Sequence, residues 1–168
     1  KMIEQYIFDR PEVILKSIQR MQARQKAEEG AQAAATLKER KQDLEADPDD
    51  PVMGNPTGTI TMVEFLDYRC GYCKRVFPTV MKVLNDNPSV RYVIKEFPIL
   101  GPESVTASRA SLAVWRTQKA KYGAFHAAVI NLRGGIPEAK ILSVATQLGI
   151  DAKKLKKDMA DPEIDQIL

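Results

Sequence analysis

The stretch Thr59–Phe77 reads TITMVEFLDYRCGYCKRVF and decides the fold of this chain. Its apolar run at 60–66 predicts a buried strand, and the residues behind the two cysteines predict a helix that reaches about Asn85. The sequence Cys70-Gly71-Tyr72-Cys73 therefore stands at the junction of a strand and a helix. A Cys-x-x-Cys pair in that position is typical of a redox site.

The chemistry of such a pair follows from its place on the helix. Cys70 lies at the helix N-terminus, where unpaired backbone N–H groups and the positive end of the helix dipole favour a thiolate. The thiolate is the nucleophile in disulfide exchange. Cys73 follows one helical turn later, so the pair can close to a disulfide or resolve a mixed one.

The composition is that of an ordinary globular protein. The chain has 168 residues, of which 44% are hydrophobic and 28% charged, and its net charge is +3. Because basic and acidic residues alternate, we expect no nucleic-acid partner. No apolar run is long enough for membrane insertion, and the start at 1–4 lacks the apolar core of a signal peptide, as a mature chain also would. Both cysteines belong to the motif, which excludes a structural disulfide framework.

Residues 1–47 predict a helical arm. They are polar and rich in Gln, Ala, Lys and Glu. Ile7, Ile14, Ile18 and Met21 follow one another at spacings of seven, four and three, which indicates a short coiled-coil-like seam. A solvated helix remains the alternative, but so thin an apolar stripe favours packing against other copies of the chain. We therefore interpret the segment as an oligomerisation arm.

The remainder divides into three parts. Residues 48–58 hold several Pro and Gly residues and predict a linker and a turn. Residues 59–100 predict a parallel βαβ unit that contains the Cys-x-x-Cys motif, with Val90–Phe97 as its second strand. Residues 101–168 are helical in period throughout. The fold class predicted from these elements is α/β.

The chain resembles the DsbA-like thiol–disulfide oxidoreductases of the bacterial envelope. The motifs that carry the resemblance are DYRCGYCK, the GNPTG turn and EFPILGPES. Among these proteins it is similar to the branch with an N-terminal oligomerisation arm, which includes suppressor-of-copper-sensitivity protein C and Com1-like proteins. The resemblance implies a thioredoxin-like fold with an inserted all-helical domain, a periplasmic location, a trimer, and disulfide isomerase or reductase activity more than plain oxidation.

The resemblance also implies roles for individual residues. Cys70 matches the nucleophilic cysteine and Cys73 the resolving one, while Gly71 and Tyr72 match the dipeptide that tunes the redox potential. Glu64 matches a buried acid that could carry a proton to or from Cys73. No cofactor and no metal is implied. The expected partners are mis-oxidised or unfolded proteins as substrates and a membrane thiol reductase as electron donor.

One departure from the family pattern concerns the second half of the thioredoxin fold. That fold has a later hairpin, opened by a cis-proline loop beside the cysteines, and a closing helix. Nothing after Phe97 predicts a strand, and the last residue, Leu168, falls inside the helical segment. We therefore expect the C-terminal hairpin and helix to be missing from this chain.

Other interpretations of the same residues remain open. Cys70 and Cys73 could supply half of a zinc site, or could bind copper or sense redox state through their soft thiolates. His126, the only histidine, is expected to be a partly buried or surface residue without a catalytic role. Lys95 and Glu96 could form a charge relay beneath the cysteines, with a salt bridge at the sheet edge as the alternative.

Overall fold

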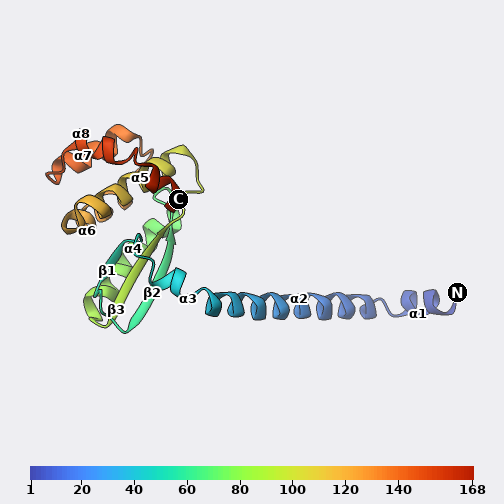
Figure 1. Ribbon diagram of the computed structural model, residues 1–168. Helices are drawn as coiled ribbons and strands as arrows, with labels where there is room; N and C mark the ends of the chain where they lie inside the picture. The colour runs from blue at the N-terminus through green and yellow to red at the C-terminus, as the bar shows by residue number, and fades with distance from the viewer. The chain divides into compact units, whose positions relative to one another are not determined.

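A computed structural model describes residues 1–168, with the exception of the Ile3 side chain (Figure 1). The chain divides into two compact units, residues 1–44 and residues 45–168. Among the described residues, no helix combines the length and the apolar character needed to cross a membrane.

The first unit is helical. Helix α1 spans Met2–Asp9 and helix α2 spans Glu12–Glu39, and the interruption between them falls at Pro11. Because proline has no N–H to donate, it is tolerated at a helix start and not inside a helix. None of the residues of α2 is buried. Its larger apolar side chains are 38–62% exposed: Val13, Ile14, Leu15, Ile18, Met21 and Leu37. Helix α3 follows at Lys41–Glu45.

The second unit contains a three-stranded sheet in the order β1-β3-β2. Strand β2 (Ile60–Leu66) lies parallel to the central strand β3 (Val90–Glu96), with Leu66 opposite Glu96. Helix α4 (Gly71–Asp86) joins the two strands. The predicted βαβ unit is therefore confirmed, and it places the Cys-x-x-Cys motif between the carboxyl end of β2 and α4.

Strand β1 (Val52–Gly54) lies in the segment for which the sequence predicts only linker and turn. It pairs antiparallel with β3, with Val52 opposite Val93. Three residues are too few to show the alternation of a strand. Gly54 ends β1 at a φ of +72°, and a Cβ at this position would lie only 2.7 Å from the carbonyl oxygen of Val90. The glycine is thus required by backbone conformation and close approach together.

Five helices follow β3, as the helical period predicts. Their bounds are Pro102–Thr117 (α5), Lys119–Ile130 (α6), Glu138–Gln147 (α7), Ala152–Asp158 (α8) and Pro162–Ile167 (α9). In the part of the chain that the structure describes, no further strand follows β3. Asp151 caps α8 by accepting hydrogen bonds from the backbone N–H groups of Lys153 and Lys154.

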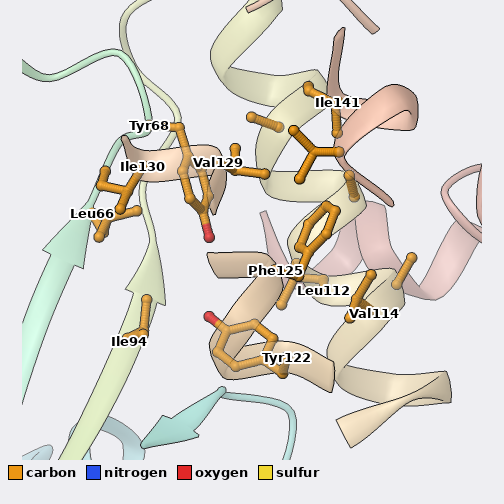
Figure 2. Close-up of a cluster of buried hydrophobic side chains, with 14 of the residues drawn as sticks. Leu66, Tyr68, Ile94, Leu112, Val114, Tyr122, Phe125, Val129, Ile130 and Ile141 are labelled. Carbon is orange, nitrogen blue, oxygen red and sulfur yellow. The ribbon is translucent and has the colours of Figure 1, made fainter. Parts of the chain in front are cut away.

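One hydrophobic core joins the sheet to these helices (Figure 2). Leu66 and Ile94 contribute from the strands, and Leu112, Phe125 and Ile130 contribute from α5 and α6, all at no more than 1% exposure. Burying a side chain of this size contributes about 1.5–3 kcal/mol. The helices therefore form a packed layer against the carboxyl half of the sheet, next to the loop that carries Cys70.

Candidate active site

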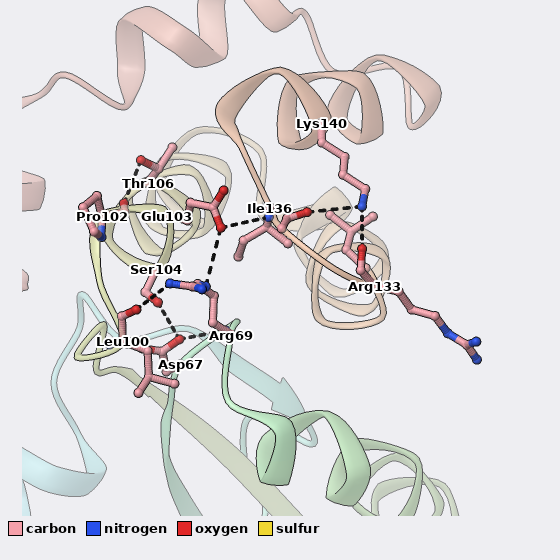
Figure 3. Close-up of polar contacts among 12 residues, drawn as sticks. Asp67, Arg69, Leu100, Pro102, Glu103, Ser104, Thr106, Arg133, Ile136 and Lys140 are labelled. Atoms are coloured by element: carbon pink, nitrogen blue, oxygen red, sulfur yellow. Dashed lines mark hydrogen bonds and ion pairs between the residues drawn. The ribbon is translucent and has the colours of Figure 1, made fainter.

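The carboxylate of Asp67 fixes the loop that leads to the motif. Its Oδ1 accepts hydrogen bonds from the Arg69 N–H at 2.7 Å and the Ser104 hydroxyl at 2.8 Å, and its Oδ2 accepts one from the Leu100 N–H at 2.9 Å. Figure 3 shows these groups converging from three segments of the chain. The Cys70 N–H donates to the Asp67 carbonyl at 3.0 Å. Asp67 thus ties the turn before Cys70 to the start of α5.

Cys70 is the N-cap residue of α4, with extended backbone dihedrals. Its carbonyl accepts the first helical hydrogen bond, from the Lys74 N–H at 3.1 Å. The backbone N–H of Cys73 lowers the pKa of the Cys70 thiol below its usual value of 9, with further contributions from the Cys73 thiol and the Tyr72 N–H. These are the helix-end donors that stabilise a thiolate.

Cys73 differs from Cys70 in its surroundings. The pKa of the Cys73 thiol is raised to about 11, mainly by burial and also by the neighbouring Cys70 and the charge of Glu64, against a lowering contribution from the Asp67 backbone. Both side chains carry free thiols and both are partly exposed. Cys70 is therefore the more acidic thiol of the pair, and Cys73 keeps its proton to higher pH.

Glu64 lines a mainly apolar hollow together with Tyr72, Cys73 and Val76. The carboxylate is half-buried on β2 and accepts a hydrogen bond from the Tyr92 hydroxyl. The structure thus brings the expected acid to the same hollow as Cys73. Tyr72 is 78% exposed, and the guanidinium carbon of Arg75 lies 4.3 Å above its ring centroid. Gly71 is also exposed, so the dipeptide faces solvent.

A buried polar cluster, Tyr68, Glu96, Ser108, Ser111 and His126, lies next to the loop of the motif. The Tyr68 hydroxyl lies 2.7 Å from His126 Nδ1 and 2.8 Å from Ser111 Oγ. Ser108 donates to Glu96 at 2.6 Å. Each of the five residues is at most 8% exposed. The cluster connects the end of β3 and the loop before Cys70 to α5 and α6.

Burial shifts the pKa values of Glu96 and His126 in opposite directions. It raises the pKa of Glu96 to about 7, although hydrogen bonds from Ser108, Ser111 and Tyr68 favour the charged form. It lowers the pKa of His126 to about 4. Between about pH 4 and pH 7 both groups therefore favour their neutral forms. His126 is a buried core residue, and no contact joins it directly to either cysteine in the described structure.

The structure does not bring Lys95 and Glu96 together as a relay. They point to opposite faces of β3, because successive side chains of a strand alternate. Lys95 forms an ion pair with Asp50, whereas Glu96 belongs to the buried cluster. Asp50 itself is buried, and burial raises its pKa to about 6.

Two residues of the site are missed by reasoning from the sequence, namely Asp67 and Tyr68. An aspartate that ends a strand and accepts the N–H two residues later is a recognisable turn signal, and this could have indicated Asp67. Tyr68 gives no such signal, because its partners on α5 and α6 are 43 and 58 residues away.

The residues that could hold a metal are few. Cys70 and Cys73 offer two soft sulfur ligands. Within the described residues, no group of three or more His, Cys, Asp or Glu side chains is arranged to hold an ion.

Comparison with known proteins gives the family. The family model of the DSBA-like thioredoxin domain matches residues 61–168. The chain therefore belongs to the DsbA-like thioredoxin domain family. It is 32% identical over 80 residues to disulfide bond formation protein D of Bacillus subtilis, a match that covers 45% of this chain and 36% of that protein. It is 28% identical over 116 residues to Na(+)/H(+) antiporter NhaA 3 of Salinispora tropica, covering 68% of this chain but only 18% of that protein.

Solved structures share the fold. A thioredoxin-like oxidoreductase from Silicibacter pomeroyi is 42% identical, with a TM-score of 0.70 over 75% of this chain and 72% of that chain. The catalytic domain of Proteus mirabilis ScsC is 26% identical, with a TM-score of 0.66 over 79% of this chain and 78% of that chain. BcfH of Salmonella enterica Typhimurium is 24% identical, with a TM-score of 0.82 over 99% of this chain and 72% of that chain. At that identity the last match shows the fold alone.

The unequal pKa values of the two thiols predict different alkylation profiles. In the Cys73→Ser variant, Cys70 should reach half its maximal iodoacetamide rate below pH 9, because the helix N–H groups remain. In the Cys70→Ser variant, Cys73 should reach it above pH 9, because burial remains. Rates measured between pH 5 and 12 check this, with the same variants in denaturant as controls. Equal profiles for folded and unfolded protein would contradict the prediction.

Replacing Glu96 should change how the free energy of unfolding depends on pH. The folded pKa of about 7 exceeds the usual 4.5, so folded protein holds this proton more tightly, and the stability from Glu96 is lost as pH rises from 4.5 to 7. The Glu96→Gln variant should therefore gain about 3 kcal/mol relative to the parent between pH 4 and pH 8.

Urea unfolding at several pH values measures this difference and cancels the titration of His126 and Asp50, which both proteins share. The control variant is Glu163→Gln, because that carboxylate is 67% exposed. Its difference from the parent should change by less than about 1 kcal/mol over the same range. A difference for Glu96→Gln that did not vary with pH would show that the carboxyl is not held protonated.

Proposed function

We propose that this protein catalyses thiol–disulfide exchange on protein substrates, as a disulfide isomerase or reductase, with Cys70 as nucleophile and Cys73 as resolving thiol. The observation that carries the proposal is the asymmetry of the pair, since one pKa is lowered at the N-cap of α4 and the other is raised by burial. A thiolate beside a thiol is the state that attacks a disulfide and can then release the product.

The reaction has two steps. The Cys70 thiolate attacks one sulfur of a substrate disulfide, forms a mixed disulfide, and releases the other sulfur as a thiolate that takes a proton from water. In reduction, Cys73 then loses its proton and attacks Cys70, so that the protein holds the disulfide and the substrate leaves with two thiols. In isomerisation, a substrate thiol attacks instead, and no net oxidation or reduction occurs.

Glu64 is proposed as the acceptor of the Cys73 proton. It lines the same hollow as Cys73, and its charge raises the pKa of that thiol, so the two groups interact. The Tyr92 hydroxyl, which donates to the carboxylate, holds it in place. Gly71 and Tyr72 are proposed to tune the redox potential through their exposed position between the cysteines.

The arm is proposed to assemble several copies, with a trimer as the expected number. Helix α2 buries none of its residues, yet Ile14, Ile18 and Met21 place apolar side chains along one face. Contact with the same face of other copies would remove that surface from water. The Cys-x-x-Cys motifs of several copies could then react with one substrate that carries wrong disulfides, which suits isomerisation.

An envelope location is proposed because the disulfides that the protein would act on persist in oxidising compartments. A two-electron donor must then return Cys70 and Cys73 to the dithiol form after each reduction. A membrane thiol reductase is the proposed partner for this step.

The proposed chemistry predicts distinct defects in three variants. Cys70→Ser should lose insulin reduction, whereas Cys73→Ser should accumulate a mixed disulfide visible by non-reducing mass spectrometry. Glu64→Gln should slow release of the mixed disulfide by about tenfold without slowing the first attack. Thr79→Val, which alters the same hollow, is the control. Insulin reduction by Cys70→Ser at the parent rate would exclude this function.

The proposed assembly predicts that two charges in the seam will separate the copies. The Ile14→Asp, Ile18→Asp double variant should sediment as a monomer at about 10 μM, because buried unpaired carboxylates are costly. The control is Lys16→Asp with Ala23→Asp, on the opposite side of α2 at 3.6 residues per turn. A parent protein that sediments as a monomer would contradict the proposed role of the arm.

A further inference from the structure

A groove lined by basic side chains lies beside the motif and shares Arg75 with the hollow of Glu64. Its volume is about 490 Å³, within the range of sites that bind small ligands or peptide side chains. Arg69, Lys74 and Arg75 contribute from the loop and first turn of α4, and Arg133 contributes from the segment 130–134 that follows α6.

The positive charge of the groove exceeds what nearby acids compensate. Lys74 donates a hydrogen bond to the Leu132 carbonyl at 2.5 Å, which fixes its ammonium group between the two walls. Burial lowers the pKa of Lys74, and the charges of Lys140 and Arg69 lower it further. Lys140 donates to the Arg133 carbonyl at 2.7 Å, and so adds a fifth base next to the groove.

The acidic side chains nearest to these bases already have hydrogen-bond or ion-pair partners within the protein. Glu103 lies 3.5 Å from the Arg69 guanidinium and also accepts the Ile136 N–H. The Asp67 carboxylate is buried and accepts three hydrogen bonds. Among the residues that the structure describes, no acidic side chain lines the groove. Figure 3 shows the exposed guanidinium of Arg133 directed away from the other side chains drawn.

The groove is placed to contact whatever reacts with Cys70. Arg69 directly precedes Cys70, and the Lys74 N–H bonds to the Cys70 carbonyl. A polypeptide that brings a disulfide to the Cys70 sulfur therefore has this basic surface within reach of the residues beside its cysteine. The mainly apolar hollow lined by Tyr72 and Val76 adjoins the groove at Arg75.

We propose that this groove binds an acidic segment of the polypeptide substrate, next to the cysteine that Cys70 attacks. The inference rests on the proposed function and adds the class of substrate that the site prefers. Carboxylates of the substrate form charge-assisted hydrogen bonds with Arg75 of α4 and with Arg133 of the segment after α6, which both line the groove. The groove thereby selects the charge of the substrate next to its reactive cysteine.

The test compares three peptides of one length and one disulfide, whose three residues beside the reactive cysteine are acidic, neutral or basic. At about 20 mM salt, the reduced protein should react with the acidic peptide about tenfold faster than with the neutral one, and with the basic peptide most slowly. At about 500 mM salt the three rates should converge to within about twofold, because exposed charges are screened.

Charge reversal separates the groove from the net charge of the protein. In the Arg133→Glu variant the ratio of acidic to neutral rates should fall to about one, because the variant places a carboxylate where the substrate carboxylates bind. The control variant Lys157→Glu makes the same change in net charge at an exposed residue of α8 that does not line the groove. It should keep the parent ratio.

A cysteine-free acidic peptide distinguishes failure of the inference from failure of the proposed function. Binding of this peptide to the parent but not to Arg133→Glu, measured by fluorescence anisotropy, supports the groove even if no peptide disulfide is reduced. Equal reduction of acidic and neutral peptides at low salt, or equal ratios in the two charge-reversal variants, would overturn the inference and leave the exchange chemistry intact.

Discussion

The buried carboxylate of Asp67 is the interaction on which the geometry of the site depends. It accepts three hydrogen bonds, and the donors come from the loop before Cys70, the segment after β3 and the first turn of α5. A buried carboxylate is stable only when its lone pairs are satisfied in this way. Loss of any one segment would leave the charge under-solvated. The start of α4 and the start of the helical layer are therefore fixed together, and Cys70 is held where the helix donors act on its sulfur.

The asymmetry of the two thiols follows from this placement and not from the cysteines themselves. Both have the same intrinsic acidity, and they are separated by a single helical turn. Cys70 lies at the N-cap, where unpaired N–H groups face its sulfur, whereas Cys73 lies inside the first turn against the hollow of Glu64. Backbone donors lower one pKa, and burial raises the other. The same helix start thus produces one thiol that loses its proton easily and one that retains it.

The sequence predicts the parts of the fold that local patterns encode. The apolar run 60–66, the Cys-x-x-Cys pair and the helical period after residue 101 give the βαβ unit and the helical layer, because strand and helix periodicities are local properties. Strand β1 is missed because three residues show no period, and its position depends on pairing with β3. Tyr68 is missed because its partners lie far away in sequence, whereas Asp67 carries a local turn signal through the Arg69 N–H but also has distant partners. The two cysteines could be identified from spacing, whereas the groove around Arg133 requires that segment 130–134 fold back beside α4.

The buried polar cluster explains how the helical layer can pack closely against the motif without a charged core. Glu96 and His126 would each be costly to bury as ions, and they reach the same region from β3 and α6. Burial favours the protonated carboxyl and the neutral imidazole, so at mildly acidic and neutral pH the cluster can consist of uncharged donors and acceptors. Tyr68 connects these groups through its hydroxyl, and its backbone belongs to the loop that Asp67 fixes. Ionisation of Glu96 would therefore act on the same loop that sets the environment of Cys70, which links the proton balance of the core to the position of that thiol.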